Sequence, residues 1–395
     1  MESNAPRLTP TRLVAAAAAL RDVVEGARTA RRVAVDAEAS GMHAYRARCC
    51  TVQLAWDDGA QVAVVDALAA PIAPLASLLG AGGPVKIVHD VAFDARLLAS
   101  EGVVLGRVHD TAIAAQMLGR PATGLASLLA AELGVRIGKG MQHHDWRIRP
   151  LDDAMLAYLG SDVRHLEALE RTLWSEVTAR EVEEAVLEET TYRIASAVAA
   201  AESRAPPPPT YVRIKGARGL DDHGLAVLRA VAGVRERIAE RQDVPPHTVA
   251  SNEALLILAQ GRAKTPAEIA RVPGVAGHPR GGPALTGDLA QAIREAPERI
   301  PEDERAHFEP ARVAPEVIKA RRDREARVLA WRRAQARLRG VDEQVVLPGH
   351  CVRDVVQADA GDLEALSRVP GIGAFRVERD GGAIVRALRG EDPRA

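Results

Sequence analysis

Short apolar runs separated by polar turns characterise residues 30–110 of the chain. Residues 33–38, 49–56 and 61–66 each have the length and apolar content of a buried strand. Asp57-Asp58-Gly59 lies between the last two runs and is a hairpin turn signal. Three consecutive strands joined in this way predict an antiparallel meander.

Beyond residue 70 the pattern alternates between helical and strand-like periods. Two further strands are predicted at residues 85–88 and 107–109. Helices are predicted at residues 10–29, 72–79, 91–100, 111–133, 151–174 and 176–204. The helix at 151–174 has Asp152 or Asp153 as its N-cap. This order of elements predicts an α/β domain whose mixed sheet is flanked by helices.

The second half of the chain has helical periodicity throughout. A proline-rich stretch at residues 205–209 ends the preceding helix and is typical of a stiff linker. The tetrapeptide Arg-Val-Pro-Gly occurs at residues 271–274 and again at 368–371, an offset of 368 − 271 = 97. Internal similarity of this kind predicts two copies of one helical module.

The same offset aligns Arg235 with Arg332 and Ala239 with Ala336. Both pairs lie in strongly helical stretches, which supports the duplication. The chain is therefore expected to divide into four parts: a domain at residues 1–204, a linker at 205–218, and helical modules at 219–300 and 301–395.

The composition is that of a protein with two or three domains. The chain has 395 residues, of which 47% are hydrophobic and 27% charged, and no apolar run reaches the ~18 residues of a membrane span. Three cysteines without disulfide or zinc spacing fit a reducing cytoplasm. Residues 1–205 carry 21 basic and 26 acidic side chains, and residues 206–395 carry 31 and 27. This asymmetry is typical of a metal-centred catalytic part beside a part that binds a polyanion, although it also arises by chance.

Two acidic side chains end the first predicted strand. Asp36 and Glu38 are two residues apart, so they lie on one face of the strand. Side by side they would repel each other and be costly to desolvate. A divalent cation relieves both costs, and oxygen-only ligands favour Mg²⁺ or Mn²⁺. The alternative is a strand end that exposes both acids to water.

A second pair of candidates lies where a strand meets a helix. His89 follows the strand at residues 85–88, and Asp94 falls within the first turn of the next helix. The helix dipole alone favours an acid at that position. His89 is either a packed strand-end histidine or a contact for the substrate.

Tyr158 and Asp162 are four residues apart and therefore share one face of a predicted helix. Taken alone, such a pair is usually a solvated face or a packed tyrosine. Gly160 lies between them and costs about 1 kcal/mol relative to alanine in a helix interior. We therefore expect another segment to approach the helix backbone closely at Gly160.

The loop at residues 138–151 combines basic and aromatic side chains. It contains Lys139, Gln142, His143, His144, Asp145, Trp146, Arg147 and Arg149. Basic groups around an exposed tryptophan suit contact with a nucleotide chain. The alternative is a surface loop with Trp146 packed into the core. The two adjacent histidines lack a third metal ligand nearby.

These motifs occur in an order that resembles a known enzyme family. The chain has Asp-x-Glu on a strand, His-x4-Asp at a strand–helix junction and Tyr-x3-Asp on a helix. The flanking segments are Thr51-Val52-Gln53-Leu54, His109-Asp110-Thr111 and Asp145-Trp146-x-x-Arg149-Pro150-Leu151. Together they resemble the four-carboxylate 3′→5′ exonucleases of the tyrosine-containing type, and among these the ribonuclease D family, over residues 30–175. The helical modules resemble HRDC domains, which completes the same layout.

The resemblance implies an α/β ribonuclease H-like exonuclease domain followed by two all-α HRDC-like domains. It implies that two divalent cations, Mg²⁺ or Mn²⁺, bind to Asp36, Glu38, Asp94 and Asp162. It also implies that Tyr158 orients the attacking water. Substrate contacts are expected from His89, Gln53, Trp146 and Arg149.

The implied activity is removal of mononucleotides from the 3′ single-stranded ends of structured RNA, with precursor tRNA as the expected substrate. Basic clusters in the C-terminal half would hold the RNA or are solvated helix faces: Arg213, Lys215, Arg218, Lys319, Arg321, Arg322, Arg324, Arg327, Arg332 and Arg333. We expect a cytoplasmic monomer without membrane association. A DNA 3′→5′ exonuclease and a non-catalytic RNA-binding protein stay open as alternatives.

Overall fold

The computed structural model describes residues 9–138, 140–203, 208–261, 263–275, 282–308 and 313–392. Lys139 of the basic loop and residues 205–207 of the predicted linker lie outside this set. The chain forms two compact units. The first comprises Met1–Ala39, Cys49–Ser203 and Val313–Ala395, and the second comprises Ser40–Arg48 and Arg204–Arg312.

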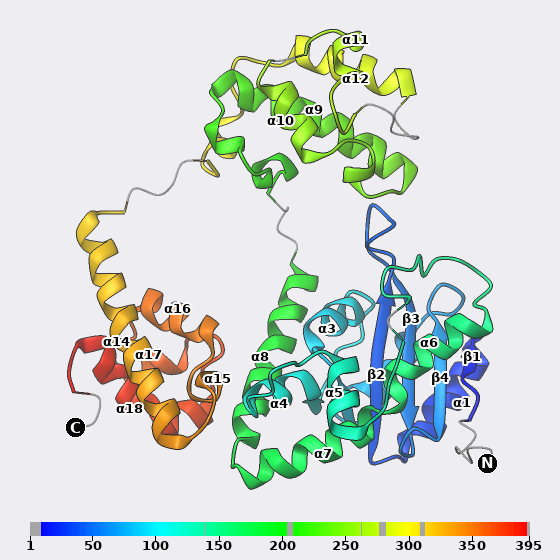
Figure 1. Ribbon diagram of the computed structural model, residues 1–395, viewed down its shortest axis with the longest axis vertical. Coiled ribbons are helices and arrows are strands. Elements are labelled where there is room, and N and C mark those ends of the chain that lie inside the picture. Colours follow the sequence, from blue (N-terminus) through cyan, green and yellow to red (C-terminus); the bar gives the residue numbers. More distant parts are fainter. Residues whose placement is uncertain are drawn as a thin grey trace. The chain divides into compact units, whose positions relative to one another are not determined.

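A six-stranded mixed sheet forms the centre of the first unit (Figure 1). Its strands are β1 (Arg12–Val14), β2 (Arg32–Ala39), β3 (Cys49–Trp56), β4 (Gln61–Asp66), β5 (Val85–Val88) and β6 (Val108–Asp110). Their order is β1-β4-β3-β2-β5-β6. Strands β2, β3 and β4 are antiparallel neighbours, whereas β1, β5 and β6 pair in parallel. The predicted meander and the mixed sheet are both confirmed.

Helices cover both faces of this sheet. They are α1 (Ala17–Arg28), α2 (Ala76–Leu79, after the 3₁₀ turn η1, Ala73–Leu75), α3 (Val91–Ser100), α4 (Thr111–Met117), α5 (Leu125–Leu133), α6 (Asp153–Arg164), α7 (Leu166–Ala179) and α8 (Glu183–Glu202). Val33 and Val35 of β2 pack into one core with α1 and α3, and Ala34 packs into the other with α4 and α7. Because side chains alternate along a strand, Asp36 and Glu38 emerge on the Ala34 face.

The N-terminal segment differs from the prediction of one helix at residues 10–29. Its first part is the short strand β1, which pairs with the edge of β4, and the helix begins only at Ala17. Val14 is completely buried in this pairing. A three-residue edge strand is specified by its partner strand, so local periodicity cannot reveal it.

The long helices predicted at 151–174 and 176–204 are also divided differently. The chain breaks at His165 between α6 and α7, and again before α8 begins at Glu183. Asp152 is the N-cap of α6, as predicted, and its carboxylate accepts a hydrogen bond from the Met155 N–H at 2.8 Å.

Two helical modules occupy the C-terminal half. The first contains the 3₁₀ turns η2 (Thr210–Arg213), η3 (Ala217–Gly219) and η4 (Pro246–Thr248), with α9 (Asp222–Gln242), α10 (Asn252–Ala259), α11 (Pro266–Ile269), α12 (Gly282–Glu295) and α13 (Glu302–Arg305). The second contains α14 (Pro315–Arg339), α15 (Glu343–Val346), α16 (Gly349–Ala358), α17 (Leu363–Ser367) and α18 (Ala374–Arg389). Among the described residues, no helix combines the length and apolar composition that crossing a membrane requires.

Residues that are 97 positions apart have equivalent structural environments in the two helical modules. Arg235 and Arg332 are both buried, and each donates a hydrogen bond to a backbone carbonyl of its own module. Gly274 and Gly371 both adopt left-handed backbone conformations, with φ of +87° and +83°. The repeated residues therefore perform the same structural tasks, and the predicted duplication is confirmed.

The second module packs against α8 within the first unit. Arg376 is completely buried and forms an ion pair with Glu188. His350 forms a 2.9 Å contact with Glu189, and its ring stacks on Tyr192 with centroids 4.1 Å apart. Charged groups of α8 are thus matched by side chains of α16 and α18.

The close approach expected at Gly160 is present. A Cβ atom at this position would lie 2.3 Å from Oγ1 and 3.3 Å from Cγ2 of Thr11. Thr11 immediately precedes β1, so Gly160 allows α6 to lie against the N-terminal strand.

We predict that Gly160→Ala destabilises the protein. The clash with Thr11 costs about 1–3 kcal/mol, which outweighs a gain of about 1 kcal/mol in helix propensity. Urea unfolding measures the difference. Gly26→Ala in α1 is the matched control, because nothing lies within 4 Å of that site; it should leave stability unchanged or raise it. Adding Thr11→Ala to Gly160→Ala should recover much of the loss, and a fully stable single variant would contradict this packing.

Candidate active site

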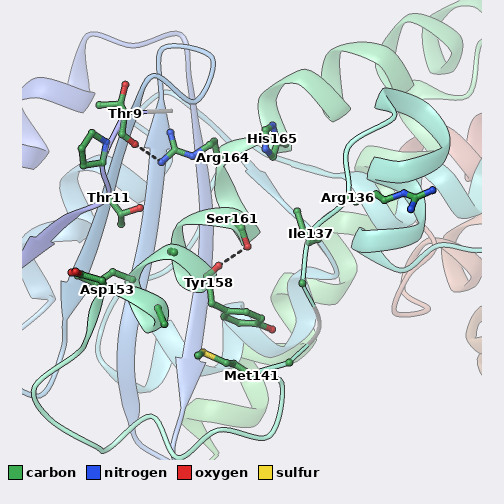
Figure 2. Close-up of a pocket in the computed structure, with 16 residues that line it drawn as sticks. Thr9, Thr11, Arg136, Ile137, Met141, Asp153, Tyr158, Ser161, Arg164 and His165 are labelled. Carbon is green, nitrogen blue, oxygen red and sulfur yellow. Dashed lines mark hydrogen bonds between the residues drawn. The ribbon is translucent and has the colours of Figure 1, made fainter. Parts of the chain in front are cut away.

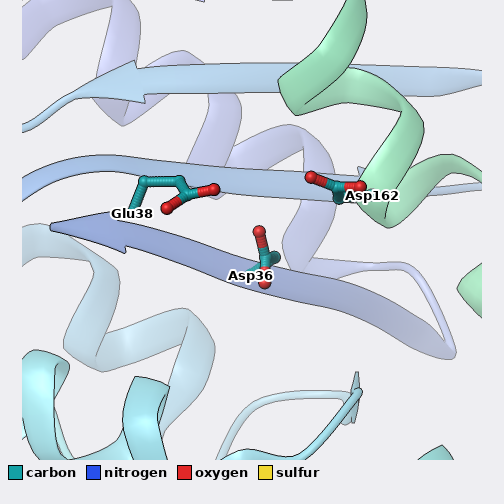
Figure 3. A group of neighbouring side chains, drawn as sticks. All are labelled: Asp36, Glu38 and Asp162. Atoms are coloured by element: carbon teal, nitrogen blue, oxygen red, sulfur yellow. The ribbon is translucent and has the colours of Figure 1, made fainter. Parts of the chain in front are cut away.

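Three carboxylates meet above the carboxyl-terminal end of β2. Asp36 and Glu38 come from β2, and Asp162 comes from α6, which packs across β3 and β4 (Figure 3). One carboxylate oxygen from each residue lies within 4.8 Å of the other two. Residues more than 120 positions apart in the sequence thus form one acidic group.

Asp94 adjoins this trio without sharing its mutual 4.8 Å spacing. It lies in the first turn of α3 and is 3% exposed. Burial raises the pKa of Asp94 well above its ordinary value, and the charges of Asp36, Asp110 and Glu38 raise it further. The four predicted acids are therefore brought into one electrostatic neighbourhood, with three of them placed to share a cation.

Burial and mutual repulsion make it costly in free energy to keep these carboxylates ionised. Burial is the main cause that raises the pKa of Asp36 to about 7 and those of Glu38 and Asp162 to about 8. For Glu38, the charges of Asp36 and Asp162 add to the effect of burial. Protons therefore occupy part of this site near neutral pH in the absence of a cation, and a divalent cation bound by the same oxygens would displace them.

Tyr158 borders the acidic group from the preceding turn of α6. Burial, followed by the charges of Asp162, Glu38 and Asp36, raises its pKa, so the phenol keeps its proton. Behind it lies the indole of Trp146, whose ring centroid is 5.8 Å away. The tyrosine is thereby held as a hydrogen-bond donor beside the carboxylates.

The trio and Tyr158 line a pocket of about 370 Å³. His89 and Gln142 complete its polar wall, and residues 124–127 at the N-terminus of α5 close another side. Tyr158 also borders a neighbouring cavity of about 830 Å³, which is lined by α6, by the segment at Thr9 to Thr11 and by residues of the loop from Arg136 to Met141 (Figure 2). The reacting group of a substrate would thus enter a small polar pocket that has a larger cavity beside it.

His89 lies in the wall of this pocket, where the prediction of a substrate contact needs it. Its Nδ1 atom is 2.9 Å from the hydroxyl of Thr111. Burial lowers its pKa, against the attraction of Asp110 and Asp90, so the ring is neutral at physiological pH.

The other predicted substrate contacts are occupied within the protein. Trp146 is 1% exposed, so the expectation of an exposed tryptophan is wrong and the alternative of a core tryptophan holds. Gln53 is completely buried and donates to the Thr51 hydroxyl at 2.9 Å. Arg149 forms two hydrogen bonds with Asp66, of 2.6 and 2.7 Å, and also donates to backbone carbonyls. These three side chains are therefore held by other parts of the protein next to the site.

Sequence reasoning named Gln142 as part of the basic loop but did not assign it to the site, and it overlooked the start of α5. Gly124 is the N-cap of α5 and supplies no side-chain cap. The first backbone N–H groups of a helix attract anions. A glycine followed by an apolar helical stretch is a weak signal, and only the fold places it beside the acids.

Comparison with known proteins agrees with this geometry. A 3′-5′ exonuclease family model matches residues 11–178, and an HRDC domain model matches residues 224–280 and 322–388. Ribonuclease D of Gluconacetobacter diazotrophicus is 34% identical over 277 residues, which cover 68% of each chain. The chain belongs to the ribonuclease D family. It is a 3′→5′ exoribonuclease, and the sequence-based assignment of family and activity is confirmed.

Further relatives extend the family match over most of the chain. Ribonuclease D of Acidiphilium cryptum is 29% identical over 367 residues, covering 91% of this chain and 90% of its own. The crystal structure of RNase D from Escherichia coli superposes with a TM-score of 0.69 at 21% identity, covering 97% of this chain and all of that one. The ribonuclease D fold therefore includes both helical modules, whereas the domain boundaries expected at residues 218 and 300 stay predictions.

We predict that Asp162→Asn stabilises the cation-free protein at pH 8 by several kcal/mol, with an upper limit of about 6 kcal/mol for a rise of about 4 pKa units at about 1.4 kcal/mol each. The folded-state pKa of Asp162 is raised to about 8. The wild type therefore gains stability as the pH falls from about 8 toward 4, and the difference between the two proteins closes over that window. Thermal unfolding in chelator measures this.

Asp153→Asn is the control for this experiment, because Asp153 is exposed in the first turn of the same helix. It should be neutral or slightly destabilising. Mg²⁺ should stabilise the wild type more than Asp162→Asn. A cation-free Asp162→Asn protein that unfolds more readily than the wild type at pH 8 would contradict the assigned repulsion.

Proposed function

We propose that this exoribonuclease trims the 3′ ends of structured RNA one nucleotide at a time, with precursor tRNA as its substrate and 5′-mononucleotides as its products. The observation that carries the proposal is the acidic trio with Tyr158 in a pocket of about 370 Å³. That volume is near the lower end of the range for pockets that hold one small ligand, about 300–1,000 Å³. It suits one terminal nucleotide better than a continuous strand.

The donor set fits divalent cations, and we propose two. Asp36, Glu38 and Asp162 offer anionic oxygens within 4.8 Å of one another, and Asp94 adds a fourth carboxylate nearby. Hard oxygen ligands of this kind suit Mg²⁺ or Mn²⁺. When bound, such ions would neutralise charge on the phosphodiester, favour hydroxide formation and stabilise the departing 3′ oxygen.

The side chains around the acids have separate tasks. Tyr158 keeps its proton and is a poor base, so we assign it the orientation of the attacking water by hydrogen bonding. Neutral His89 lies across the same pocket and contacts the terminal nucleotide. Gln142 and His89 offer polar groups at the pocket wall, and we propose that neither selects one base, so that trimming has little sequence preference.

Turnover tests the proposal directly. With a 3′-extended tRNA, the wild type should release single nucleotides, and chelator should stop the reaction. Asp36→Ala and Asp162→Ala should each lower kcat by about 10³-fold or more while RNA binding persists, and Tyr158→Phe should lower it by about 10²-fold. Products are resolved at single-nucleotide length. Internal fragments, or faster hydrolysis of a matched DNA oligomer, would contradict the proposal.

We further propose that the first helical module helps to hold the RNA, with the protein acting as a cytoplasmic monomer. Arg213, Lys215 and Arg218 are exposed on the 3₁₀ turns before α9 and on the segment between them. In the second module, Arg324 pairs with Asp359 and Arg332 is buried. Other basic side chains of α14 are exposed: Lys319, Arg321, Arg322 and Arg333. Both modules therefore offer basic groups for phosphate contacts, and the compact cluster before α9 is the one tested below.

We predict that replacing Arg213, Lys215 and Arg218 together by alanine weakens RNA binding. Each lost phosphate contact should reduce the slope of log K against log salt by about 0.7, so the triple variant loses up to about 2. Filter binding at several salt concentrations measures the slope. The control, Arg213→Lys with Lys215→Arg and Arg218→Lys, keeps the charge and should keep the slope. An unchanged slope in the alanine variant would exclude this surface.

A further inference from the structure

A fifth carboxylate, that of Asp110, lies near Asp94, and in the described part of the chain its hydrogen bonds are to backbone N–H groups. Asp110 ends β6, is completely buried and accepts hydrogen bonds from four backbone N–H groups. Its Oδ1 atom accepts from the N–H groups of Asp90, Ala112 and Ile113 at 3.1, 2.8 and 3.1 Å. Its Oδ2 atom accepts from the Val91 N–H at 2.8 Å. Both oxygens are therefore in use.

These four donors belong to the beginnings of two helices. Ala112 and Ile113 lie in the first turn of α4, for which Asp110 is the ordinary N-cap. Asp90 and Val91 begin α3, nearly 20 residues earlier in the chain. Asp90 adopts a left-handed conformation, with φ of +65°, and its side chain makes no capping hydrogen bond. Asp110 supplies the cap that α3 lacks.

The capped end of α3 carries part of the active site. Asp94 follows Val91 by three residues, so the direction of the first turn of α3 sets where the Asp94 carboxylate lies. The neighbouring Thr111 binds the segment between β5 and α3. Its hydroxyl donates to the Val88 carbonyl and contacts His89 Nδ1, both at 2.9 Å.

A neutral residue would cap α4 equally well, so capping alone does not explain a buried carboxylate here. Asparagine is as good an N-cap as aspartate, and it would avoid a negative charge that repels Asp94. Asparagine offers only one acceptor oxygen, however. At the position of Oδ1 it could still accept from Asp90, Ala112 and Ile113, but the Val91 N–H would lose its acceptor. The second oxygen of Asp110 is therefore needed for the Val91 N–H, at the first helical residue of α3.

We propose that Asp110 is a positioning residue for the exonuclease reaction, and that it holds the first turn of α3 so that Asp94 can complete the cation-binding group. This inference rests on the proposed role of Asp94 as a ligand. Residues that orient metal ligands typically contribute 10–100-fold to metal affinity or activity.

Asp110→Asn separates the two tasks of the residue. Its remaining oxygen can still cap α4, whereas its amide group faces the Val91 N–H without accepting from it. We expect the affinity of the metal-free protein for Mn²⁺ to fall by about 10-fold and kcat to fall by 10–100-fold, while the KM for RNA changes by less than about 2-fold. Calorimetry measures Mn²⁺ binding independently of turnover, and excess Mn²⁺ should restore part of the activity.

Asp152→Asn is the matched control. Asp152 caps α6, the helix that carries Tyr158 and Asp162, but accepts only one backbone hydrogen bond. Asparagine can replace that single acceptor, so Mn²⁺ affinity and kcat should stay at the wild-type level.

A double-mutant cycle identifies the residue through which Asp110 acts. If it acts through Asp94, Asp110→Asn should weaken Mn²⁺ binding in the wild type but have little further effect in an Asp94→Asn background. Equal effects in both backgrounds would overturn the proposal. So would Asp110→Asn with the Mn²⁺ affinity and kcat of the wild type.

The remaining outcomes are also decisive. Asp110→Ser keeps one capping oxygen and serves as a second variant if Asp110→Asn does not fold. Failure of both variants to fold would overturn the proposal, because Asp110 would then determine folding and not the placement of Asp94. A wild type that neither binds Mn²⁺ nor shortens RNA would contradict the proposed function itself, which is a different result.

Discussion

The repulsion among buried carboxylates is the constraint on which the rest of the nuclease domain depends. Asp36, Glu38 and Asp162 are held close enough to share a cation, at the expense of pKa values raised to about 7 or 8. Left to relax, such groups would turn toward water. The surrounding structure prevents this, because β2 lies between two paired strands and α6 is packed across the sheet.

Several groups that were expected to contact the substrate are engaged inside the protein instead. Trp146 packs behind Tyr158, and Arg149 ties its loop to Asp66 at the end of β4. Their chemistry is that of nucleic-acid contacts, but Trp146 is buried and Arg149 is paired with Asp66, which fits a supporting role. A tryptophan beside arginines is thus ambiguous in a sequence, since the same residues can stack on a base or on a tyrosine of the protein.

Much of the sheet could be predicted because its strands are continuous apolar runs with clear turns. The bounds of β3, β4, β5 and α3 agree with the periodicity, and the close packing at Gly160 followed from the cost of a glycine in a helix. The edge strand β1 could not be predicted, because its residues form a strand only by pairing with β4. The reach of Asp110 to the Val91 N–H likewise depends on two parallel strands ending side by side.

The grouping of Asp36, Glu38 and Asp162 could be predicted from the order of motifs along the chain, whereas the helical modules show why counts of charge are less informative. Several arginines of α14 look like a basic surface in the sequence. In the structure, Arg327 donates to the carbonyls of Ala387 and Leu388 at the end of α18, and Arg332 is buried. The duplication accounts for the burial of Arg332, because Arg235, the equivalent residue of the first module, is buried too.

The ion pairs between α8 and the second module bear on how the enzyme behaves when shortened. Arg376 pairs with Glu188, and His350 contacts Glu189, which also pairs with Arg193 of α8 itself. A fragment that ends before α14 would leave Glu188 without Arg376 and expose it, one turn from Glu184, on the nuclease domain. Polyanions would then be repelled by charge that the intact protein masks, so weak RNA binding by such a fragment would not measure what the missing module contributes by touching RNA.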